Sequence, residues 1–247
     1  MFTVAIIGAD GAGKTTVTRR LVESLPLPVR YVYMGINLEA SNLVLPTTRL
    51  WLEMKRSRGK RPDIGGPADP TLVKPRPKGY LKRLARGLKT ALRVANLMAE
   101  EWFRQSVVWF YQIRRFIVVF DRHFFFDYYF HHILHPDVNL SLSERLHGFV
   151  LNRFYPRPDL VVCLDAPGKV LFARKGEASA SLLERRRQEY LQLQGEVKNF
   201  VRVDAMQPLD QVVEEVSAHI QQFHAAFTGR TEVNSLGGQP APRSPSK

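Results

Sequence analysis

The chain of 247 residues is 45% hydrophobic, enough for one substantial α/β domain, and carries a formal net charge of +13. Its apolar stretches are too short and too often charged to span a bilayer, and its first residues form an apolar strand rather than a signal peptide. The single cysteine, Cys163, excludes an internal disulfide. We therefore expect a soluble, cytoplasmic protein.

The first stretch of the chain is its most informative. Residues 2–7 are an apolar, β-branched run typical of a strand, and residues 16–22 are predicted to form a helix. The turn between them matches G-x-x-x-x-G-K-[ST] without a mismatch. It consists of Gly8, Ala9, Asp10, Gly11, Ala12, Gly13, Lys14 and Thr15, and Thr16 follows it.

Each residue type in this motif suits the binding of a nucleoside triphosphate. Glycines let successive N–H groups approach phosphate oxygens, and the helix that begins near Gly13 adds its positive dipole end. Lys14 supplies a point charge for the β- and γ-phosphates, and the Thr15 hydroxyl can reach a bridging Mg²⁺. The predicted nucleotide-binding residues are Gly8, Asp10, Gly11, Ala12, Gly13, Lys14, Thr15 and Thr16.

Asp10 is the informative variable position of the motif. A carboxylate there is repelled by the nucleotide phosphates, so it would face the substrate side and attract a hydroxyl or a metal. Alternatively, Asp10 caps the loop by accepting a hydrogen bond from a neighbouring backbone N–H. The sequence leaves both interpretations open.

Strands and helices alternate along the rest of the chain. Further strands are predicted at residues 29–34, 116–120, 160–164 and 200–204, and helices at 43–54, 80–111, 124–135, 142–154, 167–174, 182–193 and 209–227. This alternation predicts a P-loop NTPase three-layer fold, with a parallel five-stranded sheet flanked by helices in one domain of residues 1–227. Residues 228–247 are predicted to be a disordered tail, because they contain almost no apolar residue.

The positive charge is concentrated in one segment. Residues 55–93 contain 13 Lys or Arg against 2 Asp, a local balance of +11. Residues 55–79 are also rich in proline and glycine, so we expect a basic, irregular insertion there. A local block of this kind indicates a charged surface or a lid rather than a general affinity for nucleic acid.

Three aspartates in or near the ends of predicted strands are candidates for binding a metal or the substrate. Asp121 and Asp165 each end an apolar strand, where an acidic group can lie beside Mg²⁺ or cap the next helix. Arg122 next to Asp121 favours Asp121 for a metal or substrate role, although which of the two lies nearer the metal stays open. Asp127 lies in an aromatic run and needs a partner, such as Arg122 or a substrate hydroxyl.

Four stretches resemble the thymidylate kinase-like family of P-loop kinases. They are the glycine-rich loop, Asp121-Arg122-His123, residues 157–167, and the basic stretches at residues 174–177 and 185–191. The resemblance covers residues 2–220 and implies transfer of the ATP γ-phosphoryl group, with Mg²⁺, to a nucleoside monophosphate such as dTMP. ATP and a small acceptor bearing a phosphate or a hydroxyl are the partners that this implies.

The resemblance also implies roles for single residues. Asp10 would face the acceptor sugar, and Arg122 would contact the transferring or acceptor phosphate. Arg174 and Lys175 would belong to a lid that closes over the triphosphate. The predicted catalytic residues are therefore Lys14, Arg122, Asp10 and Arg174, and the predicted metal ligands are Thr15 and Asp121. The run Arg185, Arg186 and Arg187 either extends the lid or is a solvated helix face.

The acceptor half departs from the family pattern. Residues 34–39 read M-G-I-N-L-E where the family has R-E-P-G-G-T, and the base-stacking Phe and its Arg have no unambiguous match. Trp102 with Arg104, or Phe103, are the candidates for that pair. A kinase for a non-nucleotide small molecule, such as a nucleoside or a sugar, therefore stays open, as does a homodimer.

A third hypothesis is a non-catalytic nucleotide-dependent protein that holds nucleic acid or an anionic membrane through residues 55–93. The face of residues 80–93 is compatible with surface binding. Aromatic residues do not interleave with the cations as nucleic-acid platforms require, so we rank this hypothesis last.

Overall fold

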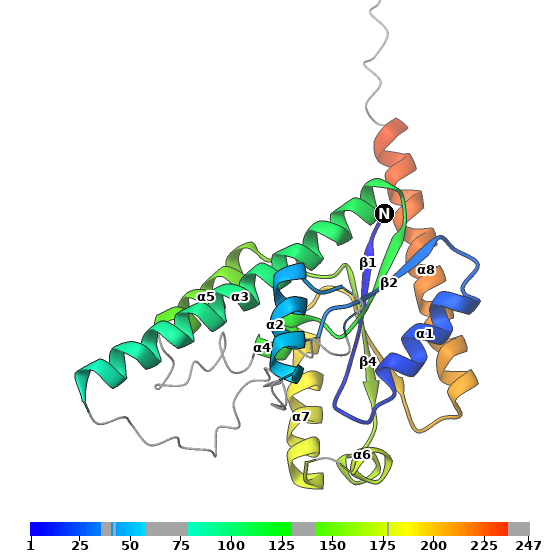
Figure 1. The fold of residues 1–247 in the computed structure, drawn as a ribbon. Coiled ribbons are helices and arrows are strands. Elements are labelled where there is room, and N and C mark those ends of the chain that lie inside the picture. Colours follow the sequence, from blue (N-terminus) through cyan, green and yellow to red (C-terminus); the bar gives the residue numbers. More distant parts are fainter. Residues whose placement is uncertain (36–40, 42, 58–78, 130–141, 177, 237–247) are drawn as a thin grey trace, which may run out of the picture.

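The computed structural model describes residues 1–35, 41, 43–57, 79–129, 142–176 and 178–236, and it shows one sheet between two layers of helices (Figure 1). The sheet has five parallel strands in the order β2-β3-β1-β4-β5. The strands are β1 (Thr3–Ile7), β2 (Val29–Tyr33), β3 (Ile117–Asp121), β4 (Leu160–Asp165) and β5 (Phe200–Asp204). The predicted five-stranded parallel sheet is therefore confirmed.

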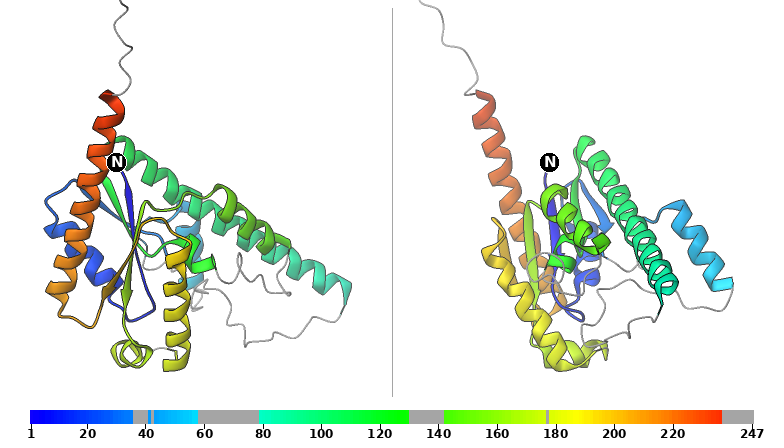
Figure 2. Two further views of the ribbon diagram at one scale, coloured as in Figure 1. Left: turned by 180° about the vertical axis from the view of Figure 1, so that it is seen from behind. Right: turned by 90° about the vertical axis from the view of Figure 1, so that its left-hand side faces the viewer.

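Helices cover both faces of the sheet. The helices of the described residues are α1 (Lys14–Ser24), α2 (Pro46–Ser57), α3 (Tyr80–Ile113), α4 (Phe124–Tyr128), α5 (Leu142–Phe154), α6 (Gly168–Lys175), α7 (Ala180–Gln192) and α8 (Leu209–Leu236), with a short 3-10 turn η3 (Leu193–Gly195). Helices α1 and α8 lie on one side, and α3, α4 and α5 on the other (Figures 1 and 2). Within the described residues, no helix combines the length and the apolar character needed to cross a membrane.

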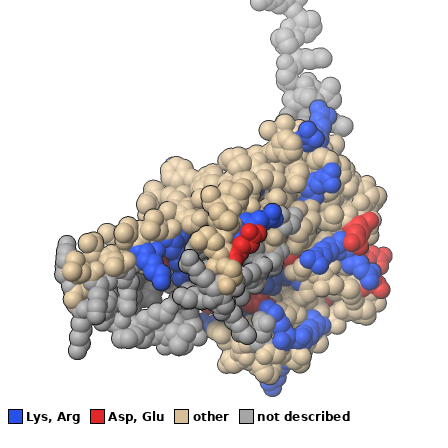
Figure 3. All heavy atoms as spheres, in the orientation of Figure 1, with Lys and Arg blue, Asp and Glu red and all other residues tan. Residues whose placement is uncertain are grey.

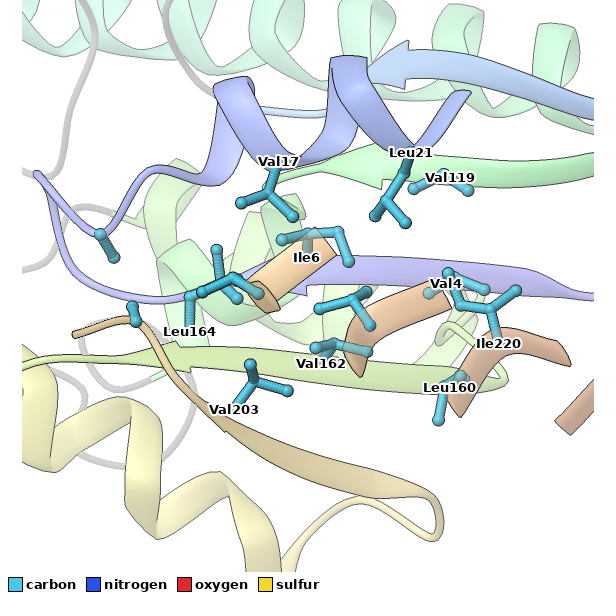
Figure 4. Close-up of a cluster of buried hydrophobic side chains, with 14 of the residues drawn as sticks. Val4, Ile6, Val17, Leu21, Val119, Leu160, Val162, Leu164, Val203 and Ile220 are labelled. Carbon is cyan, nitrogen blue, oxygen red and sulfur yellow. The ribbon is translucent and has the colours of Figure 1, made fainter. Parts of the chain in front are cut away.

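Alternate residues of the central strand supply the two halves of the core. Val4 and Ile6 of β1 pack with Val17 and Leu21 of α1 on one face (Figure 4). Ala5 and Ile7 of the same strand belong to the cluster on the other face, with residues of α3, α4 and α5. Every residue of β1, β3 and β4 is buried. A strand covered on both sides has to be continuously apolar, which is why these runs were visible in the sequence.

Several element boundaries differ from the prediction, and that of the second helix matters most. Helix α2 begins at Pro46, where proline suits the first helical position, and it continues to Ser57, so the predicted insertion does not begin at Lys55. Helix α4 covers Phe124–Tyr128, the part of the predicted helix up to Tyr128. Residues 58–78 and 130–141, which hold most of the insertion and the rest of that predicted helix, lie outside the described residues.

The predicted start of the tail at Thr228 is also corrected, because α8 runs on to Leu236. The Thr228 hydroxyl donates to the carbonyl of His224, one turn back, so this polar side chain is satisfied inside the helix. The next residues include arginine and glutamate, which favour helices, and no proline before Leu236. Residues 237–247 lie outside the described residues.

Candidate active site

The glycine-rich loop follows the carboxyl end of β1 and leads into α1. Gly8, Gly11 and Gly13 have φ angles of 140°, 90° and 87°, which side chains rarely tolerate. A Cβ atom on Gly8 would lie 2.5 Å from the carbonyl oxygen of Leu164 in β4. The loop therefore has the backbone that the motif requires, and all the predicted nucleotide-binding residues lie on it or on the first turn of α1.

The ammonium group of Lys14 lies against its own loop. It donates to the carbonyl oxygens of Gly8 at 2.7 Å and Ala9 at 2.8 Å, and the side chain is almost fully buried. Burial first, and then the nearby Arg122 guanidinium, lower the pKa of Lys14 to about 8. A negatively charged phosphate beside this ammonium would offset both effects, so the loop is suited to an anionic ligand.

Asp10 is the centre of a cluster of cations. Arg122 donates from Nη2 to Oδ1 at 2.7 Å, and Arg186 of α7 donates from Nη1 to Oδ2 at 3.0 Å. Lys14 Nζ lies 4.0 Å from Oδ1. Burial acts to raise the pKa of Asp10, but Lys14, Arg122 and Lys175 together hold that pKa well below its usual range. The carboxylate is directed to arginines from two other elements rather than to a loop N–H.

Arg122 adopts an unusual backbone conformation. Its φ angle is 68°, in the left-handed region, while its N–H still donates to the carbonyl of Ile6 at 3.1 Å. The side chain passes beside Gly35, where an added Cβ would lie 2.5 Å from Arg122 Cδ. Burial acts to lower the pKa of Arg122, but Asp127 and Asp10 raise it above its usual value. Strain of this kind is common at functional sites, and here it accompanies the contact with Asp10.

Asp127 has a partner that the sequence did not reveal. Its Oδ1 accepts a hydrogen bond from the hydroxyl of Tyr190 in α7 at 3.0 Å. Burial raises the pKa of Asp127, and the charge of Arg122 acts in the opposite direction. Helix α7 therefore contacts the site twice, through Tyr190 and through Arg186. The sequence suggested Arg122 or a substrate hydroxyl, and only the electrostatic influence of Arg122 was foreseen.

The two aspartates that end strands have different surroundings. Asp165 accepts from Arg187 at 2.6 and 3.0 Å and from Arg202 at 2.9 Å, so both of its oxygens are occupied. Asp121 is fully buried, and its Oδ2 accepts from the Tyr31 hydroxyl at 3.1 Å. Its Oδ1 has no hydrogen-bond partner among the described residues. This geometry favours Asp121 over Asp165 as the carboxylate for a metal.

Asp121 and Thr15 carry oxygen atoms of the kind that bind a magnesium ion. A buried carboxylate oxygen without a hydrogen bond and a half-buried threonine hydroxyl are hard oxygen donors, which Mg²⁺ prefers. Mg²⁺ commonly uses one or two protein ligands and takes the others from phosphates and water. The described residues hold no cluster of three or more His, Cys, Asp or Glu. Thr15 and Asp121 are thus the side chains that would hold Mg²⁺.

Arg174 is the one predicted catalytic residue that the structure places outside the cluster. Its Nη2 donates to the carbonyl of Ala205, after β5, at 2.9 Å. Its neighbour Lys175 acts on Asp10 instead, since it helps to lower the pKa of that carboxyl. A catalytic role for Arg174 stays a prediction.

The three consecutive arginines in α7, Arg185, Arg186 and Arg187, have different partners. Arg185 is exposed and pairs with Glu189 at 3.3 Å, Arg187 pairs with Asp165 and Glu184, and Arg186 alone reaches Asp10. Successive helical residues point about 100° apart, so three neighbours cannot share one partner. The sequence left two interpretations open for the run, a lid or a solvated helix face. Exposed Arg185 fits the solvated face, and a lid role for Arg186 stays a prediction.

Arg186 is therefore expected to act in the reaction while its neighbour is not. Arg186→Ala should lower kcat/KM by about tenfold or more, since a charge-assisted contact near the phosphates is lost. Arg185→Ala, a matched change on the same helix at a side chain that is 67% exposed, should leave kcat/KM nearly unchanged. Steady-state rates at matched protein concentrations check this. Equal losses in both variants would show that the effect comes from the helix and not from the contact with Asp10.

A buried polar layer on α3 supports the loop after β2. Arg104 is fully buried, and it donates to the carbonyl oxygens of Gly35 at 2.8 Å and Leu43 at 3.0 Å. Glu100 lies 3.8 Å from its Nη2 and accepts from the N–H of Leu45 at 3.1 Å. Arg104 thus binds backbone carbonyls of the loop after β2. The sequence named it as a candidate for a base-binding pair, but in the structure its guanidinium makes these structural contacts instead.

Trp102 and Phe103, the two other candidates for base binding, have different surroundings. The Trp102 ring packs edge-on against Tyr155 at a centroid distance of 5.7 Å and lies 6.1 Å from Trp109. Phe103 lines a hollow of about 250 Å³ between α2 and α3, together with Arg49 and Glu53. Of the three candidates, Phe103 is the one that lines this hollow.

Arg104 is expected to matter for stability. Arg104→Ala should lower the free energy of unfolding by about 3–5 kcal/mol, because it leaves buried Glu100 and two carbonyl oxygens without their cation. Urea unfolding followed by circular dichroism measures this. Arg114→Ala at the exposed end of α3 is the matched control, and its stability should change by less than about 1 kcal/mol. A small effect of Arg104→Ala would mean that water replaces the guanidinium.

The chain has distant likenesses to known proteins. No family model matches the chain. Deoxyadenosine kinase from M. mycoides with the products dCMP and a flexible dCDP bound is 14% identical, with a TM-score of 0.47 over 89% of this chain and 99% of that chain. The same enzyme with bound dATP is 15% identical, with a TM-score of 0.45 over 90% of this chain and all of that chain. Likenesses this distant leave the function to be judged from the side chains of the site.

Proposed function

We propose that the protein transfers the γ-phosphoryl group of ATP to a small acceptor, with a nucleoside monophosphate as the first candidate. The observation that carries this proposal is the convergence of Lys14, Arg122 and Arg186 on Asp10, beside a loop whose motif binds triphosphates. Phosphoryl transfer needs positioning and neutralisation of charge more than covalent chemistry. Three cations around one carboxylate, on three separate elements, are suited to both tasks.

Each residue then has a physical role. The loop N–H groups and Lys14 bind the β- and γ-phosphates, and α1 directs its positive end to them. Thr15 and Asp121 would hold Mg²⁺, which supplies neutralisation of the phosphate charge when bound. Arg122 and Arg186 would neutralise charge on the transferring group or the acceptor, and a planar guanidinium suits phosphate oxygens. Asp10 keeps both arginines in place until a phosphate competes for them.

A second candidate is transfer to a hydroxyl of a nucleoside or sugar. One observation favours an acceptor without a base, such as a sugar: Arg104 is fully buried and donates to backbone carbonyls, so its guanidinium is not free to bind a base. In this case Asp10 would accept the proton or a hydrogen bond of the acceptor hydroxyl. A dTMP specificity, a homodimer and a cytoplasmic location stay predictions.

An acceptor screen separates these candidates. Purified protein is incubated with ATP and Mg²⁺ and with panels of nucleoside monophosphates, nucleosides, sugars and sugar phosphates, and acceptor-dependent ADP release is measured. Turnover with nucleoside monophosphates supports transfer to a phosphate. Turnover with unphosphorylated acceptors alone supports transfer to a hydroxyl instead. EDTA should abolish either activity. Binding of ATP without turnover on any panel would contradict the enzyme proposal and favour a non-catalytic nucleotide-dependent protein.

A further inference from the structure

The amino-terminal part of α3 exposes a row of leucines. Leu81, Leu84, Leu88 and Leu92 are 78%, 59%, 61% and 63% exposed. Their spacing of three and four residues places them on one face of the helix. An exposed apolar row of this length is unusual on a protein whose three central strands are fully buried, and it marks a surface for interaction.

This row lies on the side of α3 that faces away from the sheet. The buried side of α3 carries Val94, Glu100, Arg104 and Val108. At about 100° per residue, the leucines are roughly opposite to that side. Helix α3 also extends well beyond the sheet at its amino-terminal end (Figures 1 and 2). We refer to residues 81–93 as the α3 arm.

Cations accompany the leucines along the α3 arm. The sequence places Lys82, Arg83, Arg86, Lys89 and Arg93 there and no acidic residue. Lys89 and Arg93 are exposed. In Figure 3 the surface along α3 is mostly tan, and a group of Lys and Arg spheres lies next to it. The α3 arm therefore combines an apolar face with an exclusively positive set of charges.

Charge decides which partner fits this surface. A second copy of the chain would bring one arm of five cations against another, so contact between arms would be opposed by repulsion between like charges. Nucleic acid would pair with the cations but would leave the leucines exposed to water. The surface of an anionic bilayer can contact both the leucines and the cations. The leucines would enter the boundary of the acyl chains, and the lysines and arginines would contact the headgroups.

We propose that the α3 arm docks the protein on anionic lipid bilayers. The helix lies in the plane of the interface, with Leu81, Leu84, Leu88 and Leu92 toward the lipid. Binding is reversible and depends on salt, because part of it comes from exposed charges near the surface. This property does not depend on the reaction proposed above, because among the described contacts Asp10 pairs with Arg122, Arg186 and Lys14 and not with a residue of the α3 arm.

Co-sedimentation with vesicles tests the proposal. The full-length protein is mixed with vesicles of phosphatidylcholine alone or with phosphatidylglycerol, at low and high salt. Binding should be about tenfold stronger or more to the anionic vesicles at low salt, and it should weaken at high salt. Leu84→Glu with Leu88→Glu should reduce binding to the anionic vesicles about tenfold or more, because two apolar anchors become negative charges. Ile113→Glu, an 81% exposed site at the other end of α3, is the matched control and should bind like wild type.

Two further measurements make the result decisive. Thermal melting should be unchanged in the double variant, because both leucines are exposed in the folded protein. Light scattering without vesicles then reports the oligomeric state. A wild-type dimer that the double variant breaks, with no vesicle binding, would overturn the proposal in favour of a second copy. Equal binding to neutral and anionic vesicles, equal loss in Ile113→Glu, or binding to DNA but not to vesicles would also overturn it.

Discussion

Lys14→Ala is expected to abolish phosphoryl transfer, with a fall in kcat of about a hundredfold to a thousandfold. The side chain is the one cation that the loop itself supplies, and it already lies against the carbonyls of Gly8 and Ala9. Without it, charge that develops on the γ-phosphate loses its nearest neutralising group. The measurement is acceptor-dependent ADP release at saturating ATP, with the acceptor found by screening.

The control for Lys14→Ala is Lys198→Ala, the same chemical change at an exposed lysine before β5. That variant should keep the wild-type rate. Loss of a buried hydrogen-bonded ammonium can also loosen the loop, so thermal melting of both variants is measured alongside the rates. Turnover near the wild-type level in folded Lys14→Ala would contradict the kinase proposal, because no arrangement of the remaining cations would replace a group so close to the phosphates.

Local sequence was enough to predict the sheet and the phosphate loop. Strands β1, β3 and β4 are buried on both faces, so they had to be short apolar runs, and the glycines at positions 8, 11 and 13 have φ angles that favour glycine. In each case the constraint acts on neighbouring residues. A single sequence displays such constraints directly, and the predicted order of elements follows from them.

Contacts between distant residues could not be predicted in the same way. Arg186 and Asp10 are separated by 176 positions, and Tyr190 and Asp127 by 63. Nothing in the run Arg185-Arg186-Arg187 distinguishes its middle member until the direction of α7 relative to the loop is known. The same holds for Arg104, whose neighbours in the sequence suggested ligand binding although its partners are backbone carbonyls after β2.

Arg122→Lys is expected to lower kcat by about tenfold to a hundredfold while the affinity for ATP hardly changes. The substitution keeps the positive charge, so electrostatic attraction for substrates is retained. It removes the planar fork of donors, of which Nη2 now bonds Asp10 at 2.7 Å. An ammonium cannot contact Asp10 and a phosphate oxygen with the same geometry, so the loss should appear in the transition state rather than in binding.

Arg20→Lys provides the matched control for Arg122→Lys. Arg20 also pairs with an aspartate, Asp210, at 3.1 Å, but both side chains are mostly exposed and lie away from the phosphate loop. This pair should contribute little, and the variant should react like wild type. Rates at saturating ATP, together with ATP binding measured by calorimetry, separate the two possible positions of Arg122. A large fall in ATP affinity with an unchanged rate at saturation would move Arg122 from the acceptor side of the site to the donor side.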